Sequence, residues 1–187
     1  NLGHLAAIGL SGVPVLAYMI YQKPYRLRRI VSFLDPWRDP LDSGWNIIQS
    51  LLAIGSGVLL GVGLGEGRQK FAYLPEQHTD FIFSVLGEEL GFVGSILVLS
   101  LLFALAWRGF KAALGAPDLF GSMLAVGITS VIVFQAILNI GVATGSLPVT
   151  GVTLPFVSFG GTSLIASFGA VGVLLNISAA ARSVSDT

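Results

Sequence analysis

The sequence predicts an all-α fold, a polytopic bundle of transmembrane helices with one large loop. Three observations predict it. Apolar residues make up 53% of the chain and charged residues only 11%, whereas a soluble domain carries roughly 25% charged residues. Four uncharged stretches approach the roughly 20 apolar residues that a helix needs to cross the bilayer core. Most of the charges instead lie in the long connection between the first and second stretch.

Composition also excludes several classes of function. Basic and acidic residues balance at ten each, so no net charge points to nucleic acid. The chain has no cysteine, which excludes disulfides and thiol catalysis. With two histidines and no cysteine, a structural zinc site is not expected. The first residue is Asn rather than Met, so we interpret residues 1–187 as one membrane domain of a longer chain.

The first predicted span covers about residues 5–21, and Pro14 is expected to kink it. The other three spans are predicted at about 91–107, 119–143 and 164–181. Together with the large loop at about 22–87, they make a bundle of about four helices.

Part of that loop, residues 47–67, is apolar but rich in glycine. A fifth membrane helix would carry several glycines, and each lowers helix stability by roughly 1 kcal/mol. We therefore expect a short interfacial helix at about 46–54, followed by an irregular glycine-rich stretch. A second irregular stretch, 145–163, holds two prolines, and such backbone survives at membrane depth only where protein or a water-filled cavity covers it. We expect this stretch to line a site.

Charge counting leaves the orientation open. Arg108, Lys111 and Arg182 lie near span ends on one side, which the positive-inside rule makes cytoplasmic. The basic run at 23–29 lies beside a span end on the opposite side and argues for the reverse.

Asp80 is the first candidate for chemistry, at the start of an apolar helix and close to Glu76 and His78. It has a structural interpretation as a helix N-cap and a functional one as a base or cation ligand at the mouth of a membrane helix. The two interpretations can coexist. Glu88 and Glu89 follow two turns later, where ion pairing at the interface is favoured over a role in the site.

The basic side chains and the amide side chains each allow a structural and a functional interpretation. Arg28 and Arg29 either belong to an interfacial belt with neighbouring aromatic residues or, with Lys70, bind a pyrophosphate. Gln135 and Asn139 lie one turn apart on one helix. For them, interhelical hydrogen bonds are favoured over a path for substrate.

Three stretches together resemble one family: FLDPWRDPLDSGWNIIQSLLAIGSG (33–57), GLGEGRQKFAYLPEQHTDFIFSVLGEELGFVG (63–94) and LPVTGVTLPFVSFGGTSL (147–164). They are similar to the C-terminal half of the SEDS proteins, the group of FtsW, RodA and SpoVE. RQKFAYLPE (68–76) is more like the FtsW and SpoVE branch than the elongation branch. The resemblance implies ten membrane helices in the whole protein, with residues 22–87 as the large extracytoplasmic loop in a bacterial inner membrane.

The resemblance implies peptidoglycan glycosyltransfer, in which lipid II is polymerised into glycan strands during division or sporulation. The family's essential aspartate maps onto Asp80, which we expect to act as the general base. Substrate-binding candidates around it are Arg28, Arg29, Gln49, Lys70, Glu76, His78 and Ser158.

The residues require no cofactor and predict no protein-built metal site, although Asp80 could hold a divalent cation, Mg²⁺ or Mn²⁺. Expected partners are a class B penicillin-binding protein, which is a transpeptidase, and other membrane proteins of the division machinery. A lipid II flippase and a non-catalytic scaffold of that machinery are the alternative functions.

Overall fold

The structure is a computed structural model that describes residues 3, 10–12, 14, 18, 31–42, 44–67 and 80–185, with side chains to residue 181. The chain divides into two compact units, Asn1–Ile48 and Gln49–Thr187. The described elements are helices and turns, without a strand, which confirms the predicted all-α class. Most of the predicted span at 5–21 lies outside the described residues.

In the first unit, a short 3₁₀ helix, η1, covers Pro36–Arg38. It leads into a turn closed by a hydrogen bond from the Gly44 amide to the Asp39 carbonyl, 3.0 Å long. A Cβ on Gly44 would lie 2.0 Å from the Pro36 carbonyl oxygen, so the turn has no room for a side chain.

Helix α3 covers Trp45–Ser56 and is followed by an irregular stretch from Gly57 to Gly67. This is the order expected from the sequence, a short helix and then non-helical glycine-rich backbone. Gly57 is required where the helix ends, because its Cβ would lie 1.8 Å from the Gly87 carbonyl oxygen. The two backbones therefore pack directly against each other.

Helix α5 covers Ile82–Gly115 but is broken at Gly91, where φ is 67° and ψ is −164°. The break divides it into a short segment that ends at Leu90 and a long segment that begins at Phe92, close to the predicted start of a span at 91. A break inside an apolar helix leaves backbone groups without helical partners, and each such group costs several kcal/mol in a bilayer.

The glycine-rich stretch supplies those partners. The amides of Val62 and Gly63 donate to the Glu88 and Glu89 carbonyls at 3.0 and 3.1 Å. On the other side of the break, the amides of Phe92 and Val93 donate to the carbonyls of Val58 and Leu59, also at 3.0 and 3.1 Å. Residues 58–63, which we call the clasp, thus replace the missing helical bonds with a matching set of backbone bonds.

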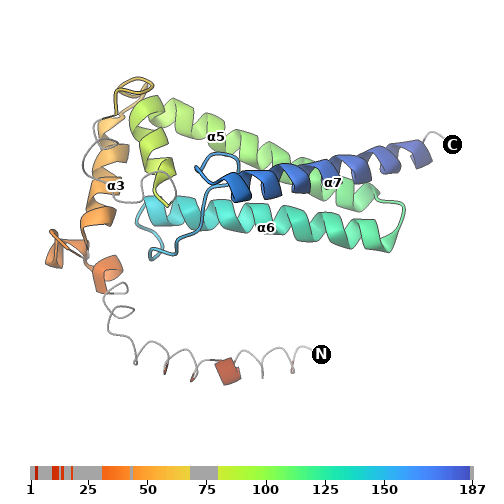
Figure 1. The fold of residues 1–187 in the computed structure, drawn as a ribbon, viewed down its shortest axis with the longest axis horizontal. Helices are drawn as coiled ribbons and strands as arrows, with labels where there is room; N and C mark the ends of the chain where they lie inside the picture. Colours follow the sequence, from red (N-terminus) through yellow and green to blue (C-terminus); the bar gives the residue numbers. More distant parts are fainter. Residues whose placement is uncertain are drawn as a thin grey trace. The chain divides into compact units, whose positions relative to one another are not determined.

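Helices α5, α6 (Leu119–Ala143) and α7 (Gly161–Ser185) lie side by side in the second unit (Figure 1). All three are long and apolar enough to cross a membrane. The predicted spans at 91–107, 119–143 and 164–181 lie within them. Asp118 caps α6 by accepting from the Gly121 amide at 2.8 Å, and Gly109 of α5 lets the backbone approach the buried Thr129 of α6.

The α6–α7 connection, residues 144–160, is irregular as expected and partly buried. Leu154 and Pro155 are both less than 2% exposed. The Ser158 hydroxyl accepts from the Leu154 amide at 2.7 Å, and Thr153 bonds Ser163 at the start of α7. The buried backbone of this connection is thereby hydrogen-bonded internally, as its position beside apolar helices demands.

Candidate functional site

Asp80 lies directly before α5, and its neighbour anchors it. Phe81 is the N-cap residue of α5 and makes no side-chain capping bond. It is 1% exposed and packs against Val142 of α6. Asp80 itself is half-buried and lies one residue before that position, so the structure has Phe81 rather than the predicted Asp80 at the N-cap.

The Asp80 carboxylate is directed toward the α6–α7 connection. Its Oδ2 lies 3.8 Å from the position that a Cβ on Gly151 would take. Gly151 has φ 77°, a left-handed conformation that a residue with a side chain adopts only with strain. The Asp80 carboxylate thus borders a glycine of the connection, with no side chain from residue 151 between them.

Asn139 holds the backbone of the site together. It is fully buried in α6, and its Nδ2 donates to the Asp80 carbonyl at 3.0 Å and to the Val152 carbonyl at 2.8 Å. One amide group therefore connects the start of α5 to the residue after Gly151. Interhelical hydrogen bonds were favoured for Asn139 from the sequence, whereas these two bonds join α6 to non-helical backbone at Asp80 and Val152.

Gln135, one turn earlier on α6, has a different place. It is half-buried and lines a groove of about 800 Å³ between α6 and α7. The groove wall also carries the hydroxyls of Thr153, Ser163 and Ser167. The two amides looked equivalent in the sequence. In the structure, Asn139 is buried and supports the backbone, whereas Gln135 lines an open, partly polar groove.

A pair of buried serines supports the site from α3, and the sequence analysis did not identify it. Ser50 of α3 and Ser84 of α5 are both 0% exposed, and their hydroxyls are hydrogen-bonded to each other. Ser50 also donates to the Ala143 carbonyl of α6 at 2.6 Å. Because a hydroxyl has one proton, Ser84 is the donor to Ser50. The signal in the sequence was a serine inside the apolar run of α3 and another one turn after Asp80.

The remaining predicted residues divide into two sets. Gln49 is buried beside Ser50 in α3, and Ser158 is buried in the turn that precedes α7. Their substrate-binding function stays a prediction. The other predicted residues lie outside the described residues: Arg28, Arg29, Lys70, Glu76 and His78. The prediction that Asp80 shares a cavity with a basic side chain therefore stays a prediction.

Glu88 and Glu89 lie at the end of the short α5 segment, away from Asp80. Glu88 is 2% exposed. Carboxylate oxygens of both residues lie 3.1 to 3.2 Å from where a Cβ on Gly67 would be, so the end of the glycine-rich stretch covers them. The described residues contain no group of three or more His, Cys, Asp and Glu side chains that could hold a metal ion.

Comparison with known proteins shows which family the chain resembles. The model of the FtsW/RodA/SpoVE family, described as "Cell cycle protein", matches residues 1–183. Stage V sporulation protein E of Bacillus subtilis is 56% identical over 182 residues, which are 97% of this chain and 50% of that protein. "Probable peptidoglycan glycosyltransferase FtsW" of Geobacter sp. strain M18 is 51% identical over 179 residues, 96% of this chain and 49% of the relative.

Two solved structures are also similar. One is described as "Structural coordination of polymerization and crosslinking by a peptidoglycan synthase complex". It has a TM-score of 0.69 at 34% identity, and the match covers 94% of this chain and 48% of the chain in that structure. The other is an aspartate-to-alanine mutant of the rod shape determining protein RodA of Thermus thermophilus. It has a TM-score of 0.52 at 44% identity, and the match covers 55% of this chain and 35% of the RodA chain.

The chain spans about half the length of the curated relatives that it matches. The family match nevertheless covers nearly every residue, and the identity to curated relatives exceeds half. The two solved structures are also similar in overall fold, with TM-scores of 0.69 and 0.52. The chain therefore belongs to the FtsW/RodA/SpoVE family of membrane proteins.

Proposed function

We propose that the protein containing this chain is a peptidoglycan glycosyltransferase that polymerises lipid II, with Asp80 as its general base. The observation that carries the proposal is the position of Asp80. Its carboxylate borders the left-handed Gly151, and its backbone is held by Asn139. The names of the FtsW relatives support the reaction class.

The chemistry requires one base and one stabilised leaving group. The acceptor sugar's hydroxyl oxygen forms a bond to the anomeric carbon of the donor while the bond from that carbon to the lipid pyrophosphate breaks. The hydroxyl proton moves to the Asp80 carboxylate, and the electron pair leaves on the pyrophosphate. A positioned base of this kind contributes roughly 10²- to 10⁴-fold to the rate.

The leaving pyrophosphate needs cationic partners, because negative charge develops on it in the transition state. Arg28, Arg29 and Lys70 are the proposed partners. Gln49, Glu76, His78 and Ser158 are the proposed contacts to the sugars and the peptide. A divalent cation at Asp80 would share in neutralising the pyrophosphate, but the described residues contain no group of three or more His, Cys, Asp and Glu side chains, so we derive no step through it.

The proposed location is the bacterial inner membrane, with residues 22–87 on the outer side, where the disaccharide of lipid II is polymerised. A polyprenyl tail would stay in the bilayer while the head group reaches the half-buried Asp80 at the start of α5. The proposed partner is a class B penicillin-binding protein, which would crosslink the new strands. The synthase complex among the similar structures, described by polymerization and crosslinking together, supports such a partner.

The decisive substitution is Asp80→Asn in the whole protein, assayed with purified lipid II. The amide keeps the size of the side chain but accepts no proton at neutral pH, so we expect glycan synthesis to fall by about 100-fold or more. The measurement is the amount of polymer on a gel of labelled glycan strands. Full synthesis by the variant would refute the assignment of Asp80.

Asp118→Asn is the matched control. Asp118 caps α6 at the other end of α5, and asparagine caps a helix about as well as aspartate. We expect unchanged synthesis and unchanged thermal stability. A similar loss in both variants would indicate damage to the fold rather than to the reaction.

The groove that Gln135 lines is the one observation that favours the flippase alternative. Labelled lipid II in proteoliposomes separates the functions. Translocation without polymer would support a flippase, and neither activity would support a scaffold. Gln135→Leu should leave polymerisation unchanged and should stop translocation only if the groove is a lipid path.

A further inference from the structure

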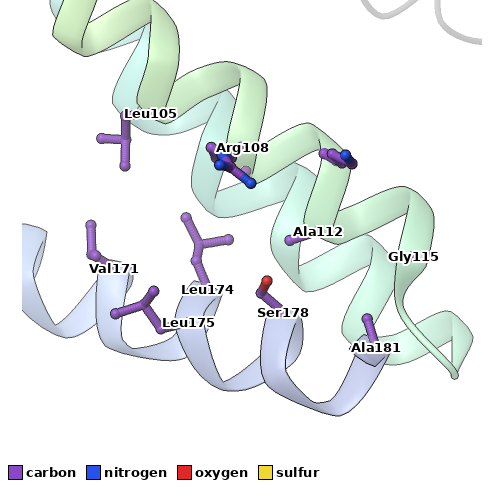
Figure 2. Close-up of a pocket in the computed structure, with 11 residues that line it drawn as sticks. Leu105, Arg108, Ala112, Gly115, Val171, Leu174, Leu175, Ser178 and Ala181 are labelled. Carbon is purple, nitrogen blue, oxygen red and sulfur yellow. The ribbon is translucent and has the colours of Figure 1, made fainter. Parts of the chain in front are cut away.

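A second groove runs between α5 and α7, on a different side of the bundle from the groove at Gln135. One part, of about 510 Å³, reaches from Leu105 to Gly115 on α5 (Figure 2). A second part, of about 360 Å³, reaches from Val98 to Leu105. The two parts adjoin at Leu105 and Val171, which line both of them, and we call them together the α5–α7 groove or trough.

The walls of the α5–α7 groove are apolar along nearly all of its length, with Leu174 of α7 directed toward α5 (Figure 2). The charged residues of the lining, Arg108 and Lys111, lie in the part toward its Gly115 end and are exposed. No described carboxylate pairs with either cation. Ser178 adds a hydroxyl at the same end.

The distance from Arg108 to the apolar end of the groove at Val98 fits half a bilayer. Val98 and Arg108 are ten positions apart, which is about 15 Å along a helix at 1.5 Å per residue. The hydrocarbon core is about 30 Å thick, so a single leaflet is about 15 Å deep. A ligand with its charged part at Arg108 and Lys111 would thus extend its apolar part to about the middle of the membrane.

We propose that the α5–α7 groove binds an anionic phospholipid. The phosphate group lies against Arg108 and Lys111, and an acyl chain follows the apolar wall past Leu105 and Val171 toward Val98. A free phosphate would use the two cations but not the trough. An uncharged helix from elsewhere in the protein would fill the trough but would leave two cations without a counter-charge.

The test uses the protein produced from its whole reading frame, purified, stripped of lipid and examined by native mass spectrometry. Phosphatidylglycerol and phosphatidylcholine are titrated separately, and inorganic phosphate is added as a competitor. We expect phosphatidylglycerol to bind more tightly than phosphatidylcholine, because each basic residue near a membrane surface favours an anionic lipid. Inorganic phosphate at the same concentration should not displace it.

Two pairs of variants test the two parts of the groove. Arg108→Ala should weaken phosphatidylglycerol binding about fivefold, while Arg38→Ala, which removes an exposed cation from η1, should not change it. Val171→Trp should fill the trough and weaken binding of both lipids. Val173→Trp, two residues along α7 and not lining the groove, is its control.

Three results would overturn the proposal. The first is no preference for phosphatidylglycerol in the unmodified protein, as expected if another helix fills the groove. The second is equal binding by the unmodified protein and Arg108→Ala. The third is full displacement of the lipid by inorganic phosphate. Thermal unfolding of each variant in detergent shows that lost binding does not come from lost folding.

Discussion

Asn139 and Gln135 have different environments, although the sequence pattern led to the same prediction for both. Both amides lie on the same side of α6, and interhelical hydrogen bonding was favoured for both. Asn139 is fully buried and connects the carbonyls of Asp80 and Val152, whereas Gln135 borders an open groove. The difference arises because Asn139 lies near the end of α6, where two irregular segments present carbonyls that need a donor.

The buried amide is expected to position Asp80. In Asn139→Asp the side chain keeps its size but loses the two N–H donors, which leaves the Asp80 and Val152 carbonyls without this partner. Each buried group that loses its partner costs about 1–3 kcal/mol. We expect a lower melting temperature in detergent and slower glycan synthesis.

The control for this prediction is Gln135→Glu, the same chemical change one turn away, which should cost less stability. A structural function for Asn139 predicts lost stability alone. A positioning function also predicts that glycan synthesis per folded molecule falls. Unchanged stability together with unchanged synthesis in Asn139→Asp would contradict both.

The break in α5 is the main feature at the scale of elements. It turns the first part of the helix, which Asp80 precedes, away from the long membrane-spanning part, as Figure 1 shows. The clasp satisfies the freed carbonyls and amides, so the break is stable at the edge of an apolar helix. Gly61 and Gly91 make this possible, because a Cβ on Gly91 would lie 2.3 Å from the Gly61 nitrogen.

Gly91→Ala should therefore destabilise the protein strongly. With φ 67° and ψ −164°, Gly91 adopts a backbone conformation that is essentially restricted to glycine and that costs other residues about 1–3 kcal/mol, and the contact with Gly61 adds to it. We expect the melting temperature to fall clearly. Gly169→Ala in α7, where a Cβ meets nothing within 4 Å, should be neutral or slightly stabilising.

Hydrogen exchange tests the clasp itself in the unmodified protein. The amides of Val62 and Gly63 should exchange slowly although they lie in irregular backbone, because they donate to carbonyls of α5. Exchange as fast as that of the neighbouring exposed Leu64 would contradict the clasp.

At the scale of the whole molecule, the open question is which ends of the helices lie on which side of the membrane. The chain contains no cysteine, so a single introduced cysteine labels one known place once any others in the protein are removed. Leu41 and Leu114 are 83% and 89% exposed and lie on opposite sides in the proposed orientation.

With a membrane-impermeant maleimide, we expect Leu41→Cys to be labelled in intact spheroplasts and Leu114→Cys only after the membrane is permeabilised. This follows from residues 22–87 being extracytoplasmic and from Arg108 and Lys111 lying at the cytoplasmic end. The reverse pattern would refute the proposed orientation and move the lipid of the α5–α7 groove to the outer leaflet.

Local patterns in the sequence were enough to predict the membrane class of the protein and the approximate positions of α5, α6 and α7. They also predicted the short helix before the glycine-rich stretch. Each of these depends on runs of neighbouring residues, because apolar length decides which segments can span a bilayer. Asp80 could also be singled out from its place before an apolar helix and from the family resemblance.

Contacts between distant segments could not be predicted in the same way. Nothing local indicates that the Val58–Gly63 clasp pairs with a break at Gly91, that Ser50 bonds Ser84, or that Arg108 borders a trough extending to Val98. Such partners are chosen by the geometry of packing, since a buried polar group must find whichever donor or acceptor the fold brings near it. The sequence thus singled out Asp80, and only the tertiary structure decided which groups hold its backbone in place.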